Sequence, residues 1–416
     1  AGFLEVGLKE TADIYIINSC AITREAESKA RQIASSIKGR AANSVVVLAG
    51  CYATRLGGEN IKNVDIYVSQ AEKDKILELC MRYISEKNVC ANHAQDGRNE
   101  SVKSSEEDRR EVASKTRAQL KIQDGCKSFC SYCIVPYIRT GEYSMPPEEV
   151  ISQIEKLCAS GYSEIVLTGI HIGKYALADI YGNAFGFENL LQALYLYPFK
   201  TPFRIRMSSI DPGELSEKII YLIKNSSRFV PHFHMALQSG SDKILKAMNR
   251  KYTRAEFIEK LKLIESNIEL AAVTSDVIVG FPGETREDFQ QTYDLLNEFN
   301  FYDFHIFQYS DRPGTAASKL DGKIGASEKK ERSMILHQLK YKKNSIYYKN
   351  NVGREALVIP EKILSRCDSG SVLLSGHSER YIETVFKGVA DMIGKIVRVK
   401  LLASSKTIDG MDAEAL

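Results

Sequence analysis

Residues 125–133 read Gly-Cys-Lys-Ser-Phe-Cys-Ser-Tyr-Cys, and this run holds three of the nine cysteines in the 416-residue chain. The three, Cys126, Cys130 and Cys133, have the spacing C-x3-C-x2-C. Three thiolates in one short loop can hold an iron–sulfur cluster, because thiolates are the ligands that such clusters need. With only three cysteines present, one iron of a cube lacks a protein ligand, and a substrate or cofactor can coordinate there.

Zinc is the alternative metal for a cysteine cluster. Structural zinc sites usually have four tetrahedral ligands, with a second ligand pair further along the chain. The next cysteine, Cys158, falls in a helical pattern, and His171 lies far along the chain. The spacing therefore favours an iron–sulfur cluster over zinc.

Composition excludes several classes of protein. The 56 Lys and Arg against 53 Asp and Glu leave a net charge of +3, which excludes a wholly basic nucleic-acid binder. Hydrophobic residues make up 44%, as in a globular protein. We identify no apolar stretch of membrane-spanning length and no signal peptide, so we expect a cytoplasmic protein with reduced thiols.

The first segment alternates strands with helices. Strands are expected at residues 13–18, 44–49 and 65–68, and helices at 24–38 and 72–85. This order predicts a small parallel α/β domain over residues 1–94. Cys20 and Cys51 follow the ends of the first two strands, where open α/β sheets bind ligands. The polar, charged residues 95–114 are expected to form a linker.

The second segment, residues 115–345, repeats the same alternation on a larger scale, and the cysteine run follows its first strand. Its pattern predicts a (β/α)6 partial barrel or a doubly wound sheet, with function at the carboxyl ends of the strands. The expected strands are 118–122, 164–168, 203–208, 232–237, 274–280 and 303–308; the expected helices are 147–160, 188–196, 214–225, 241–248, 254–267 and 285–298.

The last segment changes character. Residues 319–349 predict a helix with a basic face, and residues 346–404 contain short β-rich runs separated by Gly. This pattern predicts a small OB-like β-barrel. We expect residues 405–416 to be a disordered tail.

Together these residues resemble the radical S-adenosylmethionine (SAM) superfamily. The resemblance rests on C-x3-C-x-aromatic-C, with Tyr132 as the aromatic, on the first loop of a (β/α)6 domain. It implies that the open iron binds the amino and carboxylate groups of SAM and that the reduced cluster cleaves SAM to a 5′-deoxyadenosyl radical. It also implies that Tyr132, Gly169, Gln238 and Gly280 contact SAM.

A closer resemblance is to the methylthiotransferase family, and it spans nearly the whole chain. The stretches that carry it are residues 123–139, 237–253, 275–284 and 309–315, with 18–26 and 49–53 in the first domain. Residues 376–382 resemble the TRAM module, an RNA-binding β-barrel. Residues 167–173 and 206–213 resemble the branch that modifies threonylcarbamoyladenosine in tRNA. The alternatives are isopentenyladenosine in tRNA and an aspartate of a ribosomal protein.

The resemblance implies two [4Fe–4S] clusters. One is held by Cys126, Cys130 and Cys133; the auxiliary one is held by Cys20, Cys51 and a third cysteine, and supplies the sulfur that is methylated and inserted at C2 of the adenine. The implied partners are the tRNA anticodon loop, modified at position 37, an electron donor such as flavodoxin or ferredoxin, and a sulfur source. One SAM gives the methyl group and another gives the radical.

The auxiliary site is incomplete in this chain. Its third cysteine is expected before Ala1, so we expect the chain to be an N-terminal truncation. An alternative of another functional class is an RNA-binding protein that keeps the fold but does not catalyse the reaction, because its auxiliary cluster is incomplete.

Three residues near the expected site depart from the family pattern. Thr140, Met145 and Gln308 stand where Gly, Arg and Pro are usual. Among other polar residues, we expect His232 and His234 to be packed rather than ligands. Arg139, Arg204, Arg206 and Arg312 are candidates to meet phosphate or carboxylate groups, with packing as the alternative. Cys80 and Cys158 are expected to be buried thiols.

Overall fold

The structure is a computed structural model that describes Leu4, Val6 and residues 10–21, 24–87, 116–178, 182–367 and 370–416. The expected linker, residues 95–114, lies outside the described residues. The chain divides into two compact units. The first comprises Ala1–Lys103, Tyr132–Gly141 and Arg312–Thr315; the second comprises Ser104–Ser131, Glu142–Asp311 and Ala316–Leu416.

The first unit is a parallel α/β domain, as predicted. Strands β1 (Ile14–Ser19), β2 (Val45–Gly50) and β3 (Ile66–Val68) pair in parallel in the order β1-β2-β3. The central strand β2 is buried along its whole length, because its alternate residues enter two different core clusters. The helical elements are α1 (Arg24–Arg40), α2 (Cys51–Leu56), the 3-10 helix η1 (Gln70–Lys75), α3 (Ile76–Lys87) and α4 (Val135–Ile138).

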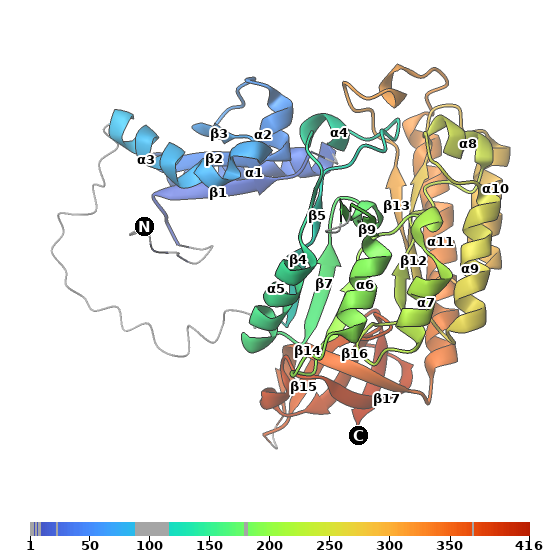
Figure 1. Ribbon diagram of the computed structural model, residues 1–416. Helices are drawn as coiled ribbons and strands as arrows, with labels where there is room; N and C mark the ends of the chain where they lie inside the picture. The colour runs from blue at the N-terminus through green and yellow to red at the C-terminus, as the bar shows by residue number, and fades with distance from the viewer. Residues whose placement is uncertain are drawn as a thin grey trace. The chain divides into compact units, whose positions relative to one another are not determined.

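The second unit contains two three-stranded parallel sheets, of which β4, β7, β12 and β13 are labelled in Figure 1. One sheet has the order β10-β7-β4 and another the order β11-β12-β13. Isolated parallel bridges, Ile205 with Phe229 and Ile210 with Met235, connect the β10 segment to the β11 segment. The strands are β4 (Arg117–Lys121), β7 (Glu164–Thr168), β10 (Arg204–Met207), β11 (His232–His234), β12 (Ala272–Val279) and β13 (Asp303–Gln308). This confirms the α/β class and the predicted alternation.

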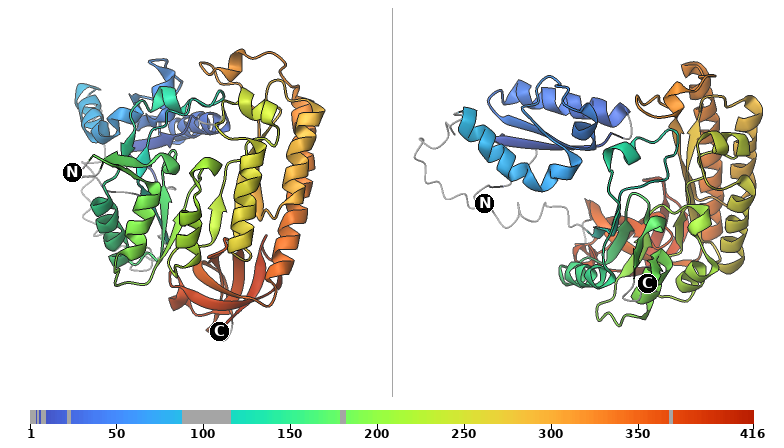
Figure 2. Two further views of the ribbon diagram at one scale, coloured as in Figure 1. Left: turned by 45° about the vertical axis from the view of Figure 1, so that its right-hand side comes forward. Right: turned by 45° about the horizontal axis from the view of Figure 1, so that its top comes forward.

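Helices lie between successive strands and along one side of them (Figures 1 and 2). They are α5 (Pro147–Ala159), α6 (Phe187–Leu196), α7 (Glu217–Lys224), α8 (Asp242–Ala247), α9 (Arg254–Asn267) and α10 (Arg286–Glu298). Short elements fill the loops: β5 (Gln123–Asp124), β6 (Tyr143–Ser144), η2 (Ile172–Lys174), β8 (Ala176–Ala178), β9 (Ala184–Gly186), η3 (Pro212–Glu214) and η4 (Ala317–Lys319). The helices and strands share one large core that includes Cys158.

A long helix, α11 (Ala326–Asn351), leads into a closed five-stranded barrel. Its strands are β14 (Glu355–Arg366), β15 (Val372–Ser378), β16 (Glu383–Gly388), β17 (Val397–Ser404) and β18 (Met411–Ala415), with the 3-10 helix η5 (Ala390–Met392). The prediction of a β-barrel is confirmed. The prediction of a disordered tail is wrong, because β18 closes the barrel by pairing with both β16 and β17.

The basic face expected on α11 is partly turned inward. Arg332 is buried and pairs with Glu284, and Lys340 pairs with Asp303 at 2.7 Å. Lys343 is also buried, and its Nζ donates to the backbone oxygen of Phe299 at 2.7 Å. These cations therefore attach α11 to β13 and to the loops that precede α10 and β13. No helix of the described residues is long and apolar enough to cross a membrane.

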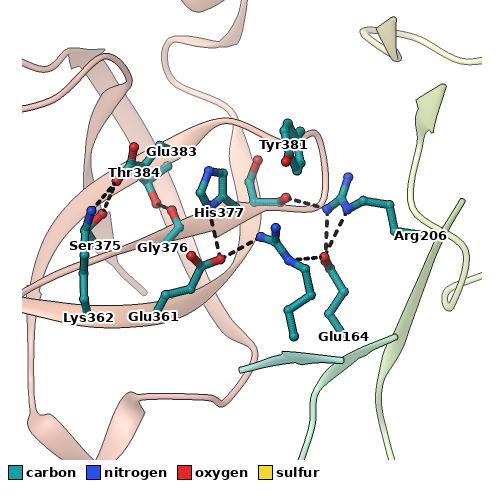
Figure 3. A network of polar contacts seen from close by, with 12 residues as sticks. Glu164, Arg206, Glu361, Lys362, Ser375, Gly376, His377, Tyr381, Glu383 and Thr384 are labelled. Carbon is teal, nitrogen blue, oxygen red and sulfur yellow. Dashed lines mark hydrogen bonds and ion pairs between the residues drawn. The ribbon is translucent and has the colours of Figure 1, made fainter. Parts of the chain in front are cut away.

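A buried carboxylate joins the partial barrel to the β-barrel (Figure 3). Glu164, at the start of β7, pairs with Arg117 at 2.7 Å, with Arg206 at 3.0 Å and with Arg204. Arg204 and Arg206 also donate to the backbone oxygens of His377 and Ser378, at 2.9 and 3.1 Å. Arg204 and Arg206, which were candidates to meet a phosphate or carboxylate group, therefore pair with a carboxylate of the protein itself, Glu164. Their hydrogen bonds also attach β10 to the β-barrel.

Glu164→Gln should destabilise the second unit by about 3–5 kcal/mol, because it leaves buried guanidinium groups without a counter-charge. Burial alone would raise the pKa of Glu164, but Arg206 and Arg204 lower it well below its ordinary value. The contribution of the Glu164 carboxylate to the free energy of unfolding is therefore complete at neutral pH and is lost as pH falls through this lowered pKa. Urea unfolding followed by circular dichroism measures the difference.

The matched control is Glu355→Gln, whose partner Arg398 lies 3.6 Å away with both side chains mostly exposed. It should cost less than about 1 kcal/mol. Equal losses from the two variants at pH 7 would contradict the role given to Glu164.

Candidate active site

The cysteine run begins directly after β5 and is anchored by Gln123. This side chain is buried, and its Nε2 donates to the backbone oxygens of Asp124 and Gly125, at 3.1 and 2.7 Å. Its Oε1 accepts a hydrogen bond from the backbone N of His171 at 2.9 Å. Gln123 therefore ties the start of the cysteine loop to the segment that follows β7.

Gly169 makes this anchoring possible. A Cβ atom at this position would lie 2.9 Å from Cβ and 3.0 Å from Oε1 of Gln123, closer than side chains normally approach. Packing against Gln123 therefore requires a glycine at position 169, the position at which the family resemblance also predicts a contact with SAM. The contact with SAM itself stays a prediction.

The far side of the loop is held by the turn between α8 and α9. Ser131 donates from its backbone N to Met248 at 2.9 Å, and Asn249 Nδ2 donates to the Phe129 oxygen at 2.8 Å. Phe129 and Asn249 both have left-handed backbone conformations, with φ of 48° and 57°. Such conformations cost energy and persist where surrounding contacts fix them. The loop is therefore fixed at both ends.

Cys126 and Cys130 have polar neighbours within the second unit. Cys126 Sγ lies 3.7 Å from Nδ1 of His171 and 3.3 Å from Oγ of Ser128. Cys130 Sγ accepts a hydrogen bond from Nη1 of Arg250 at 3.4 Å. Cys133 and Tyr132 follow on the same loop, at the start of Tyr132–Gly141, which is grouped with the first unit.

A charged network connects the neighbours of these two thiols. His171 Nε2 lies 2.9 Å from Glu214 and 3.7 Å from Oδ2 of Asp211, and the other oxygen of Asp211 pairs with Arg250. Burial would lower the pKa of His171, but its hydrogen bonds with Cys126 and Glu214 raise that pKa to about 10. The network thus presents cationic donors to Cys126 and Cys130.

Our sequence analysis did not single out these four network residues. His171 follows β7, and Asp211 and Glu214 follow β10, so all three lie past the carboxyl ends of strands. That position was the available signal, because ligand sites form there in α/β sheets. Arg250 follows α8 and lies in the stretch 237–253 that carries the family resemblance, although no role was predicted for it.

Gln238 and Gly280, two further predicted SAM contacts, lie at strand ends in the same unit. Gln238 has φ of 60° and bridges to β12, where its backbone N donates to the Asp276 oxygen at 2.8 Å. Gly280 follows β12 with φ of 73°, and its backbone N donates to Glu284 at 2.6 Å. Their backbone conformations fit a ligand-binding loop, and their contacts with SAM stay predictions.

The three departures from the family pattern have different surroundings. Met145 packs against the large core, and its backbone N donates to Ile122 at 2.8 Å. Thr140 and Gln308 are exposed. The remaining arginine candidate with a carboxylate partner, Arg312, is buried and pairs with Glu27 at 2.9 Å inside the first unit.

Cys20 and Cys51 lie at one edge of the sheet of the first unit. They directly follow Ser19 and Gly50, which are partners in the β1–β2 register. Gly50 has φ of 100°, and a Cβ there would lie 2.8 Å from the Ser19 oxygen, so the two strand ends approach closely. Cys80 belongs to a different core cluster and is buried, as is Cys158, which confirms both predictions.

The residues present fit an iron–sulfur cluster. Cys126, Cys130 and Cys133 are all partly accessible, and their soft thiolate donors suit iron. Basic donors beside two of the thiols match the negative charge that thiolates bring to a cluster.

Gly169→Ala should disturb the cysteine loop, because the added methyl group collides with Gln123. We expect a stability loss of about 1–3 kcal/mol and a lower iron content after anaerobic reconstitution. Gly213→Ala is the matched control, since a Cβ there meets nothing within 4 Å. Iron and sulfide assays with thermal unfolding measure both effects, and equal iron contents in the two variants would contradict the anchoring role.

Comparison with known proteins supports the same assignment. The Radical SAM superfamily model matches residues 120–296, and the model of the uncharacterized protein family UPF0004 matches residues 1–69. In structure, the chain is similar to the radical S-adenosylmethionine methyltransferase TsrM from Kitasatospora setae, with a TM-score of 0.52. The two are 14% identical, over 74% of this chain and 65% of the other, a likeness that concerns the fold alone.

Curated relatives cover nearly the whole chain. The threonylcarbamoyladenosine tRNA methylthiotransferase MtaB of Bacillus subtilis is 37% identical over 97% of this chain and 88% of the relative. The MtaB protein of Aquifex aeolicus is 35% identical, over 96% and 93% respectively. The tRNA-2-methylthio-N(6)-dimethylallyladenosine synthase of Pelotomaculum thermopropionicum is 33% identical, over 96% and 88%. The chain therefore belongs to the methylthiotransferase family of radical SAM proteins and is a sulfur-transferring radical SAM enzyme.

Proposed function

We propose that this enzyme adds a methylthio group to C2 of N6-threonylcarbamoyladenosine at position 37 of the tRNA anticodon loop. The observation that carries the proposal is the 37% identity, over 97% of the chain, to a relative named for that activity. Relatives named for the dimethylallyladenosine substrate reach 33% over a similar length. Because the difference is small, the substrate needs a direct test.

In this proposal Cys126, Cys130 and Cys133 hold a [4Fe–4S] cluster. When bound, the cluster supplies the electron that cleaves SAM reductively. His171 and Arg250 position the thiolates of Cys126 and Cys130 through the contacts described above. Tyr132, in the cysteine loop, and Gly169, Gln238 and Gly280, which follow β7, β11 and β12, are the proposed contacts to SAM.

A second cluster would be held by Cys20, Cys51 and a third cysteine. The adjacent placement of Cys20 and Cys51 at one sheet edge supports this assignment. The reaction also needs an electron donor, such as flavodoxin or ferredoxin, and a source of sulfur. We place the reaction in the cytoplasm, where tRNA is modified.

The β-barrel of residues 355–415 is the proposed tRNA-binding module. Lys387, Lys400 and Arg398 are exposed on its strands, and such cations bind phosphates with an affinity that falls as salt rises. The target base must leave its stack to enter an enclosed site, and an anticodon loop makes this step inexpensive.

Cys126→Ala should abolish formation of 5′-deoxyadenosine from SAM under dithionite, because one ligand of the cluster is lost. The iron content should fall by about four per chain. Cys367→Ala is the control, since this cysteine lies in the β-barrel, partly exposed. Chromatography of the products together with iron assays measures both outcomes. SAM cleavage at the parent rate in Cys126→Ala would overturn the assignment of the loop.

Mass spectrometry of tRNA nucleosides from a deletion strain tests the substrate. The methylthio form of threonylcarbamoyladenosine should disappear and return when the gene is restored. Loss of the methylthio form of isopentenyladenosine would instead identify isopentenyladenosine as the substrate. An unchanged tRNA profile would favour a ribosomal-protein aspartate or the RNA-binding hypothesis without turnover.

A further inference from the structure

We propose that His234, Asp276 and His305 form a binding site for a divalent transition-metal ion inside the partial barrel of the second unit. The proposal does not rest on the proposed function or on the cysteine loop. It rests on the pairing of three adjacent strands, the positions of the ligand atoms, and the cavity that they face.

The strand register brings the three side chains together. In the parallel sheet β11-β12-β13, His234 pairs with Thr274 and Asp276 pairs with His305. Thr274 and Asp276 are two residues apart on β12, so their side chains point to the same face of the sheet. His234, Asp276 and His305 therefore occupy neighbouring positions on that face.

The ligand atoms are close enough to share one ion. One nitrogen of each histidine and one oxygen of Asp276 all lie within 4.8 Å of one another. His234 Nε2 and Asp276 Oδ2 are 3.3 Å apart. Tetrahedral ligands about 2.1 Å from one zinc ion are about 3.4 Å apart. Binding therefore requires the ligand atoms to close in from their present separations of up to 4.8 Å, and the exposed side chain of His305 can rotate to do this.

A hydroxyl group orients the most enclosed of these ligands. Oγ1 of Thr274 lies 2.9 Å from Nδ1 of His234, and this contact directs the opposite nitrogen toward Asp276. Metal-ligating histidines commonly have such a partner on the nitrogen that does not bind the metal. The proposal gives His234 a ligand role in place of the packed role that the sequence predicts, whereas His232 is packed, with its ring stacked on Tyr381 at 4.8 Å.

The site opens onto a cavity of about 360 Å³ that all three residues line. The strongest charges nearby are compensated: Arg206 pairs with Glu164 at 3.0 Å, and Asp303 pairs with Lys340 at 2.7 Å. The carboxylate of Asp276, by contrast, pairs with a ligand candidate, His234. Its carboxylate is therefore placed to meet a cation at the cavity wall.

Two imidazoles and one carboxylate suit zinc, iron(II) or manganese(II) rather than calcium or magnesium, which prefer oxygen ligands. Three protein ligands leave at least one coordination position open. That position faces the cavity, where water or a carboxylate of a small ligand can occupy it. The rival is a simple ion pair between His234 and Asp276 that binds no metal.

Zinc binding to the full chain with reconstituted iron–sulfur clusters tests the proposal. The protein is incubated anaerobically with Zn²⁺ and gel-filtered, and its zinc, iron and sulfide are counted. About one zinc per chain should be retained, and X-ray absorption should show nitrogen and oxygen neighbours at about 2.0–2.2 Å. His305→Gln and Asp276→Asn should each lower the retained zinc at least tenfold while leaving iron and sulfide unchanged.

His305→Gln is the key variant, because its exposed side chain can be changed with little risk to folding. His337→Gln on α11 is the matched control: His337 contacts the Ser333 oxygen at 2.7 Å and lies outside the cluster, so this variant should keep its zinc. Equal zinc in the parent and His305→Gln would overturn the proposal. Sulfur neighbours at about 2.3 Å would overturn it too, since the zinc would then occupy cysteine sites.

Discussion

The buried charge of Glu164 is the constraint on which much of the second unit depends. A carboxylate excluded from water is tolerated only where cations and hydrogen bonds surround it. Arg117, Arg204 and Arg206 supply them from β4 and β10, the two strands that flank β7. Arg204 and Arg206 also donate to carbonyl groups of the β-barrel, and Arg117 pairs with Glu361 of β14. One carboxylate therefore holds neighbouring strands together and supports the attachment of the C-terminal module.

At the other end of β4 and β7 the constraint is steric. Gln123 can hold the cysteine loop only because Gly169 leaves room for it. The charged network of His171, Asp211 and Arg250 then connects three separate loops beneath two thiols. The amino ends of the strands thus attach the β-barrel, and their carboxyl ends hold the candidate active site. This division is expected of parallel strands in α/β barrels.

Local pattern was enough to predict most of the fold. Strands at 164–168 and 303–308 and the helix at 254–267 have the expected limits, because hydrophobic spacing and caps such as Thr253 are local signals. Strand β18 was missed because Met-Asp-Ala-Glu-Ala has no β-branched residue, and its pairing with β16 and β17 is not local. The charged network of His171, Asp211, Glu214 and Arg250 was also not predicted, because these residues are far apart in the sequence and come together only in the tertiary fold.

The two histidines of β11 have different surroundings that the sequence pattern does not distinguish. His232 and His234 alternate along one strand, so the pattern alone gives them the same status. Register distinguishes them: His232 pairs with Ala272 and stacks on Tyr381, whereas His234 pairs with Thr274, beside Asp276. His305 reaches the same place from β13 because it is the register partner of Asp276. A metal site built from single residues of three strands has no sequence motif, and only the pairing of the strands makes it visible.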